Sequence, residues 1–203
     1  MRSLLQAGAR VQTQLAARGF RFCFIGGIAN FRWGTPRLTN DLDLTVLAGF
    51  GGEGPVITAL LEDLRPRIPD AADFAWRHRV LLLRTVDGVA VDVALGAMPF
   101  EEAAIARATD AELARGAVLR TCSATDLVVH KAFAARPQDW VDIEGVLVRQ
   151  RGALVWPQLW ADLSELAALK EAPELLDELE RVARRAEAVV GPFTRPRSGE
   201  SGR

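Results

Sequence analysis

Cysteine and long hydrophobic runs are both scarce in this chain of 203 residues. The two cysteines, Cys23 and Cys122, lack CxxC spacing, so they cannot supply the four ligands of a structural zinc site. Cys23 lies in an apolar run, which predicts a buried, reduced thiol and a cytoplasmic protein. Uninterrupted apolar runs are short, as at residues 80–83, and far below the roughly 18 residues of a membrane span. No basic segment followed by an apolar one opens the chain, so we expect neither a membrane span nor a signal peptide.

Charge of one sign is also lacking. The chain has 25 basic and 26 acidic residues and a net charge of −1, which excludes a strongly basic protein that binds nucleic acid through a charged tail. A local basic patch remains open. Lysine is rare among the basic residues, and its two positions are Lys131 and Lys170. A hydrophobic fraction of 49% is that of an ordinary globular chain.

Hydrophobic periodicity predicts an α/β region followed by an all-α region. Asp87-Gly88 between two β-rich runs is a strong hairpin signal. We expect helices at residues 1–19, 28–33, 55–64, 100–108, 123–135, 138–150, 156–169 and 173–190. We expect strands at residues 21–25, 42–47, 79–86, 89–95, 111–113 and 117–120.

The change of pattern predicts a domain boundary near residue 122. Residues 1–122 would form the α/β domain, and residues 123–192 would form a helical C-terminal region. The remaining segment, residues 193–203, is polar and rich in proline, glycine and serine, so we expect it to be disordered.

Three carboxylates are the centre of chemical interest. Asp41 and Asp43 are two residues apart at the start of a predicted strand, so both point to the same face, within reach of one divalent ion. Asp92 lies on the less apolar face of another predicted strand. If the two strands are neighbours, the carboxylates converge, and such a triad can hold two magnesium ions for phosphoryl chemistry. The alternative is that these side chains are simply solvated surface acids.

A glycine pair precedes the carboxylates. Gly26 and Gly27 lie between a predicted strand and a predicted helix, where backbone amides can receive a phosphate. A Gly-Gly pair at such a place can equally be a turn without any ligand.

Longer segments resemble a known family. Residues 25–44 read IGGIANFRWGTPRLTNDLDL, residues 91–93 read VDV, residues 99–102 read PFEE, and Lys131 precedes RPQDWVD at residues 136–142. Over about residues 20–150 the chain resembles the polymerase-β-like nucleotidyltransferase superfamily, and within it the small bacterial AbiEii-type nucleotidyltransferases, many of which are toxin–antitoxin or phage-defence components. The resemblance implies a polymerase-β-like nucleotidyltransferase fold, which is a mixed sheet with flanking helices, plus a C-terminal helical bundle.

The resemblance also implies an activity and roles for single residues. The protein would be a magnesium-dependent enzyme that moves a nucleoside monophosphate from a nucleoside triphosphate to a hydroxyl of RNA or protein, and a cognate toxin or antitoxin could be its partner. The metal ligands, which are also the catalytic residues, would be Asp41, Asp43 and Asp92, with Asp92 as the base. The nucleotide would contact Gly26, Gly27, Arg37, Thr39 and Lys131.

The sequence departs from many relatives, which have Gly-Ser at the position of Gly26-Gly27. It is also too short for a complete CCA-adding enzyme. Two other functions stay open. One is a small-molecule nucleotidyltransferase of the aminoglycoside-modifying kind, in which Glu101, Glu102 and the acids of the helical region could receive a polycation. The other is a non-catalytic nucleotide-binding or partner-binding module on the same fold.

Some residues have a structural alternative. Lys131 could be a solvated helix residue. Asp139 and Asp142 are expected to pair with Arg136 or to stabilise a helix N-terminus. The basic stretch around His78 could contact a polyanion or be plain surface. The tryptophans are expected in the core or at an interface rather than as base-stacking platforms.

Overall fold

The computed structural model describes residues 1–194. Within them the chain forms two compact units, an α/β unit of Met1–Ile28 and Arg37–Cys122 and a helical unit that combines Ala29–Pro36 with the chain from Ser123 onward. Helix α2 (Gly26–Trp33) contributes residues to both units. The predicted tail at residues 193–203 lies outside the described residues from position 195 onward.

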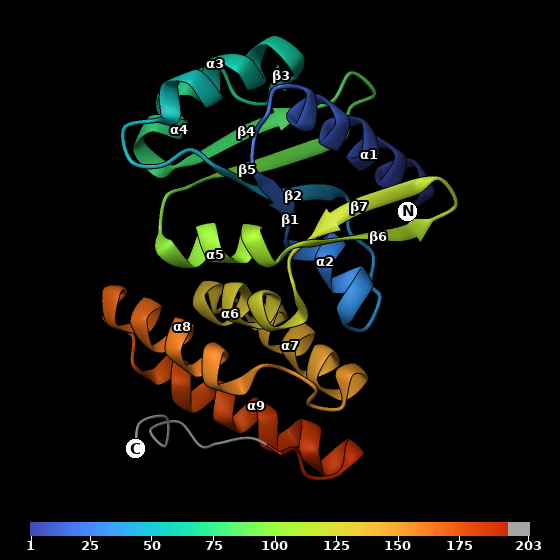
Figure 1. Cartoon of the computed structure of the whole chain (residues 1–203), viewed down its shortest axis with the longest axis vertical. Coiled ribbons are helices and arrows are strands. Elements are labelled where there is room, and N and C mark those ends of the chain that lie inside the picture. Colours follow the sequence, from blue (N-terminus) through green and yellow to red (C-terminus); the bar gives the residue numbers. More distant parts are fainter. Residues whose placement is uncertain (195–203) are drawn as a thin grey trace. The chain divides into compact units, whose positions relative to one another are not determined.

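The described part of the α/β unit contains one seven-stranded mixed sheet, with strand order β3-β4-β5-β2-β1-β7-β6 (Figure 1). Strand β2 pairs in parallel with β5, and β1 pairs in parallel with β7, whereas the other neighbours are antiparallel. The strands are β1 (Phe22–Phe24), β2 (Asp41–Leu47), β3 (Arg65–Pro66), β4 (Val80–Arg84), β5 (Ala90–Gly96), β6 (Thr109–Ala114) and β7 (Ala117–Thr121). The helices of this unit, besides α2, are α1 (Arg2–Ala17), α3 (Glu53–Asp63), α4 (Ala71–His78) and α5 (Pro99–Arg107).

The two faces of the central strands differ sharply in burial. Alternation along a strand sends neighbouring side chains to opposite faces. Helix α1 packs on the apolar face, where Gly8 lies against Leu42 and Leu119. The side chains of that face are almost completely buried, at 2% exposure or less, and are Leu42, Leu44, Val46, Leu81, Leu83, Val91, Val93 and Leu95. The opposite face of β2 and β5 carries the three aspartates, at intermediate burial.

Besides the end of α2, the described part of the helical unit contains four helices whose buried apolar side chains face one another. They are α6 (Ala124–Ala134), α7 (Pro137–Gln150), α8 (Trp156–Leu169) and α9 (Glu174–Val190). Ser123 caps α6 by accepting a hydrogen bond from the Asp126 amide. The segment Ala29–Pro36 is fixed to α7, because Arg149 donates to the Gly34 carbonyl at 2.6 Å and Gln150 donates to the Trp33 carbonyl at 2.7 Å.

Several sequence expectations need correction. The segment between residues 64 and 79 carries no strong period, yet it forms β3 and α4. Helix α2 begins at Gly26 itself, and α3 begins at Glu53, before Pro55. Of the tryptophans expected in the core or at an interface, Trp156 and Trp160 lie in the core at 2% exposure each, whereas Trp76 is 53% exposed on α4. Both cysteines are buried and outside any disulfide among the described residues, as predicted for Cys23. In residues 1–194, no helix combines the length and apolarity needed to cross a membrane.

Candidate active site

Strand register brings the predicted carboxylates together. In the parallel pair of β2 and β5, Asp43 lies directly opposite Asp92, and Asp41 is one step along the same face. Directly opposite residues of neighbouring strands share a face with their Cβ atoms about 5 Å apart. The condition set by the sequence is therefore met, since the two aspartate-bearing strands are neighbours.

The glycine pair lies directly against β2. Gly26 has a φ of +53°, and a Cβ atom placed on it would lie 2.6 Å from the Asp43 Cγ and 2.7 Å from the Asp43 Cβ. A Cβ atom on Gly27 would lie 2.5 Å from the Thr39 hydroxyl. The amide of Gly27 donates a long hydrogen bond of 3.4 Å to an Asp43 oxygen. Only glycine permits this approach of the α2 N-terminus to the carboxylate.

We predict that Gly26→Ala reduces the nucleotidyl transfer expected from the sequence by at least about 100-fold, because displacing a reacting group by about 1 Å costs that much. The alanine must push the Asp43 side chain away from its position. Transfer of label from α-phosphate-labelled nucleoside triphosphate measures the effect. Gly19→Ala is the matched control, since Gly19 has a φ of +73° and no heavy atom within 4 Å of an added Cβ. Equal losses in both variants would attribute the effect to backbone strain alone.

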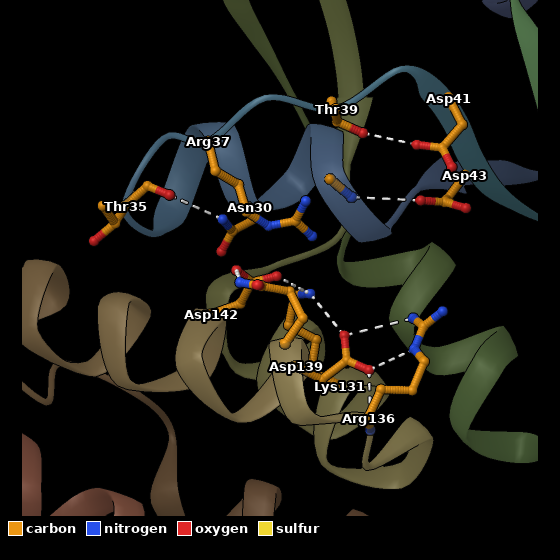
Figure 2. Close-up of polar contacts among 12 residues, drawn as sticks. Asn30, Thr35, Arg37, Thr39, Asp41, Asp43, Lys131, Arg136, Asp139 and Asp142 are labelled. Carbon is orange, nitrogen blue, oxygen red and sulfur yellow. Dashed lines mark hydrogen bonds and ion pairs between the residues drawn. The ribbon is translucent and has the colours of Figure 1, made fainter.

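Thr39 orients Asp41. Its hydroxyl donates to the Asp41 Oδ1 at 2.7 Å, and the residue is 8% exposed (Figure 2). The resemblance assigned this hydroxyl to the nucleotide, whereas in the structure it holds the first carboxylate of the site. Arg37 is exposed in the loop before β2, and its guanidinium donates to the Leu38 carbonyl at 3.3 Å. The nucleotide contacts expected for both residues stay predictions.

Asp92 has a partner that the sequence did not indicate. Arg67 forms an ion pair with it at 2.6 Å, with side-chain exposures of 26% and 31%. Partial burial raises the pKa of the Asp92 carboxyl above its ordinary value, the Arg67 guanidinium opposes this rise, and the Asp41 charge adds to it. The contribution of Asp41 indicates that the two carboxylates repel each other. Arg67 directly follows β3, and its amide donates to the carbonyl of Leu82 on β4, the neighbour of β5. Strand β3 is too short to give a periodic signal in the sequence.

The donor set fits magnesium, although the side chains as they stand do not form a closed metal site. Within residues 1–194, no three acidic, histidine or cysteine side chains lie close enough to hold one ion. However, three carboxylates share one face, all donors are oxygen, and two of the acids repel each other, which favours a divalent cation between them. Arg67 already pairs with Asp92, so a cation that binds this carboxylate competes with the arginine.

We expect Arg67→Met to tighten the binding of Mn²⁺, used as a probe ion, about fivefold in the absence of nucleotide, because a partly exposed ion pair is worth up to ~1 kcal/mol. Electron paramagnetic resonance of free Mn²⁺ measures the affinity. Arg21→Met is the matched control, since it removes another arginine of this unit, which pairs with Glu102 at 2.8 Å. If Arg67→Met binds Mn²⁺ no more tightly than Arg21→Met, Arg67 does not compete with the cation.

Lys131 is part of a buried network in the helical unit. It is 4% exposed, and its ammonium donates to Asp142 at 2.6 Å and to Asp139 at 3.1 Å (Figure 2). Asp139 also accepts from the Arg136 guanidinium at 2.7 Å, and Gln138 donates to Asp142 at 3.0 Å. Lys131 is therefore not a solvated residue, and the pairing expected between Asp139 and Arg136 is confirmed. The contact of Lys131 with nucleotide phosphates stays a prediction.

The acidic residues suggested for a polycation pocket are engaged elsewhere. Glu101 accepts hydrogen bonds from the amides of Ala97 and Met98, at 2.8 and 2.9 Å, and so closes the first turn of α5. Glu102 pairs with Arg21. Nothing in these contacts favours a role for the two glutamates in binding a cationic substrate.

Comparison with known proteins supports the fold. No protein-family model and no curated protein matches the chain in sequence. The crystal structure of an antigenic nucleotidyltransferase-like protein from Paracoccidioides brasiliensis is similar over 87% of this chain and 92% of that chain, with 16% identity and a TM-score of 0.53. The solution structure of the antibiotic-resistance factor ANT(2'')-Ia covers 92% of each chain, with 14% identity and a TM-score of 0.48. The chain thus has the α/β fold of nucleotidyltransferase-like proteins, a mixed sheet with flanking helices and a C-terminal helical bundle, as its sequence predicts.

Proposed function

We propose that the protein is a magnesium-dependent nucleotidyltransferase that moves a nucleoside monophosphate from a nucleoside triphosphate to a hydroxyl acceptor and releases pyrophosphate. One observation carries this proposal. Asp43 and Asp92 are in register on neighbouring strands, with Asp41 on the same face and the Gly26-Gly27 turn directly against Asp43. A fold alone does not specify a reaction. This arrangement, however, brings carboxylate oxygens close to backbone amides that no side chain covers.

The reaction follows from the roles of these groups. The acceptor oxygen forms a bond to the α-phosphorus, the bond from that phosphorus to the bridging oxygen breaks, and pyrophosphate leaves. The proton of the hydroxyl would pass to Asp92, which lies in register with Asp43 on the same face. Magnesium held by the three aspartates would offset the charge of the phosphates and of the leaving group. Positioning and charge compensation provide most of the acceleration in such reactions.

The remaining assignments belong to the same proposal. Gly26 and Gly27 would receive phosphate oxygens at the N-terminus of α2, in place of the long bond to Asp43. Contacts from Arg37, Thr39 and Lys131 would complete nucleotide binding. We further propose a relationship to AbiEii-type proteins, an acceptor that is RNA or protein, and a role as one component of a toxin–antitoxin pair in the cytoplasm.

A labelling experiment tests the activity. The protein is incubated with Mg²⁺, a cell extract and each of the four nucleoside triphosphates, labelled either at the α-phosphate or at the γ-phosphate. We expect label from the α-position only, in one macromolecular fraction, and none with the Asp41→Asn/Asp43→Asn variant. Transfer of the γ-label would instead indicate a kinase. Binding of nucleotide with no transfer to any fraction would support the non-catalytic module.

A further inference from the structure

Two arginines face each other beside the carboxylates. Arg65 on β3 lies directly opposite Arg84 on β4. The row continues across the sheet, because Arg84 lies opposite Ala90 on β5, and Ala90 lies opposite Asp41 on β2. Residues in one such row share a face, and three strand spacings amount to about 14 Å. The arginine pair therefore stands on the same face as Asp41, Asp43 and Asp92, at the β3 edge of the sheet.

The charge of this pair is not compensated. Like charges directly opposite each other in an antiparallel ladder are destabilising. Both arginines are exposed, and within residues 1–194 neither forms an ion pair.

Four acids that are close in sequence to β3 and β4, or lie on β5, pair with other arginines. Arg18 forms ion pairs with Glu62 and Asp63 at the end of α3, at 2.9 and 2.6 Å. Arg10 forms an ion pair with Asp87, in the turn after β4, at 2.6 Å. Arg67 takes Asp92 at 2.6 Å. Two positive charges thus remain side by side, at the β3 edge of the face that carries the three aspartates.

We infer that Arg65 and Arg84 form a docking surface for the phosphate backbone of an RNA acceptor, and that this surface excludes polycations from the site. The inference rests on the proposed function and names its acceptor class. Guanidinium groups bind phosphates through paired, charge-assisted hydrogen bonds. An RNA strand that crosses β3 and β4 would place phosphates on the two arginines and carry its chain toward the aspartates.

RNA meets two requirements of the site together. The transfer needs a hydroxyl at the aspartates, and RNA presents ribose hydroxyls on the same chain as its phosphates. A polycation such as an aminoglycoside would bring positive charge against the arginine pair, which opposes its binding. An acidic protein surface could also meet the arginines, and the experiment below separates this case from RNA.

The test compares two variants that lose the same charge. Arg65→Gln/Arg84→Gln removes the docking pair, and Arg2→Gln/Arg115→Gln removes two other exposed arginines of the same unit that form no ion pair in residues 1–194. Fluorescence anisotropy with a labelled 20-nucleotide single-stranded RNA measures affinity between 50 and 200 mM salt. Thermal melting verifies that both variants fold.

We expect the docking variant to bind about 10- to 30-fold more weakly near 0.1 M salt and to lose about 1.4 from the salt slope, since each phosphate contact on a single strand contributes about 0.7. The control variant should bind like the unaltered protein. Equal binding by the two variants, no binding of RNA by the unaltered protein, or loss of affinity for polyglutamate but not for RNA would each overturn the inference. Magnesium-dependent nucleotide binding, measured in parallel, fails only if the proposed function is wrong.

Discussion

Replacement of Asp41 or Asp43 by asparagine is expected to reduce transfer of the α-phosphate label by at least about 10³-fold, because each change removes a charge that would stabilise the transition state through the cation. Asparagine keeps the size of the side chain, so Thr39 can still donate at position 41 and Gly27 at position 43. The chemistry is lost while the local geometry is kept.

Folding should be unaffected by these changes or slightly favoured. Asp41 raises the pKa of Asp92, which means that their charges repel in the folded protein, and a neutral residue at position 41 removes that repulsion. Thermal melting should therefore give a midpoint equal to or above that of the unaltered protein. Asp73→Asn, an identical change at an exposed position of α4, is the matched control and should keep full activity. Transfer that survives in both site variants would refute the proposed function.

The arrangement of the carboxylates was predictable because it depends on strong local patterns. Alternation of apolar residues places Asp41 and Asp43 on one face of β2 and Asp92 on the wet face of β5, and Asp87-Gly88 predicts the hairpin that sets the register of β4 and β5. The pairing of β2 with β5 is a long-range contact. No local pattern specifies this pairing, so the sequence predicts convergence of the carboxylates only if the two strands are neighbours.

The ion-pair partners of the site residues come from segments whose sequence has no clear hydrophobic periodicity, or from long-range packing of helices. Strand β3 has two residues, and the sequence pattern does not predict it. It nevertheless places Arg65 opposite Arg84 and leads directly to Arg67, the partner of Asp92. The burial of Lys131 was missed for another reason. A lysine on a helix is normally solvated, and only the packing of α6 against α7 brings Asp139 and Asp142 to its ammonium.

We expect Lys131→Met to lower the free energy of unfolding by about 3–5 kcal/mol, because removing one partner of a buried ion pair leaves uncompensated charge behind. Here the charges left are those of Asp139 and Asp142, whose side chains are each 3% exposed. Arg136 still pairs with Asp139, so the remaining cost falls mainly on Asp142. Urea denaturation measures the change.

Two variants make the origin of this loss testable. Lys170→Met removes the other lysine of the chain, which is exposed and donates to the Phe133 carbonyl, and it should cost less than about 1 kcal/mol. Lys131→Met/Asp142→Asn should recover much of the stability, since it removes the acid that the lysine neutralises. If Lys131→Met is as stable as Lys170→Met, the network does not stabilise the fold. Kinetics of Lys131→Met at low temperature, where it stays folded, then separate a nucleotide-binding role from a purely structural one. Loss of a contact with the nucleotide phosphates raises KM for the triphosphate, whereas loss of a purely structural lysine leaves KM unchanged.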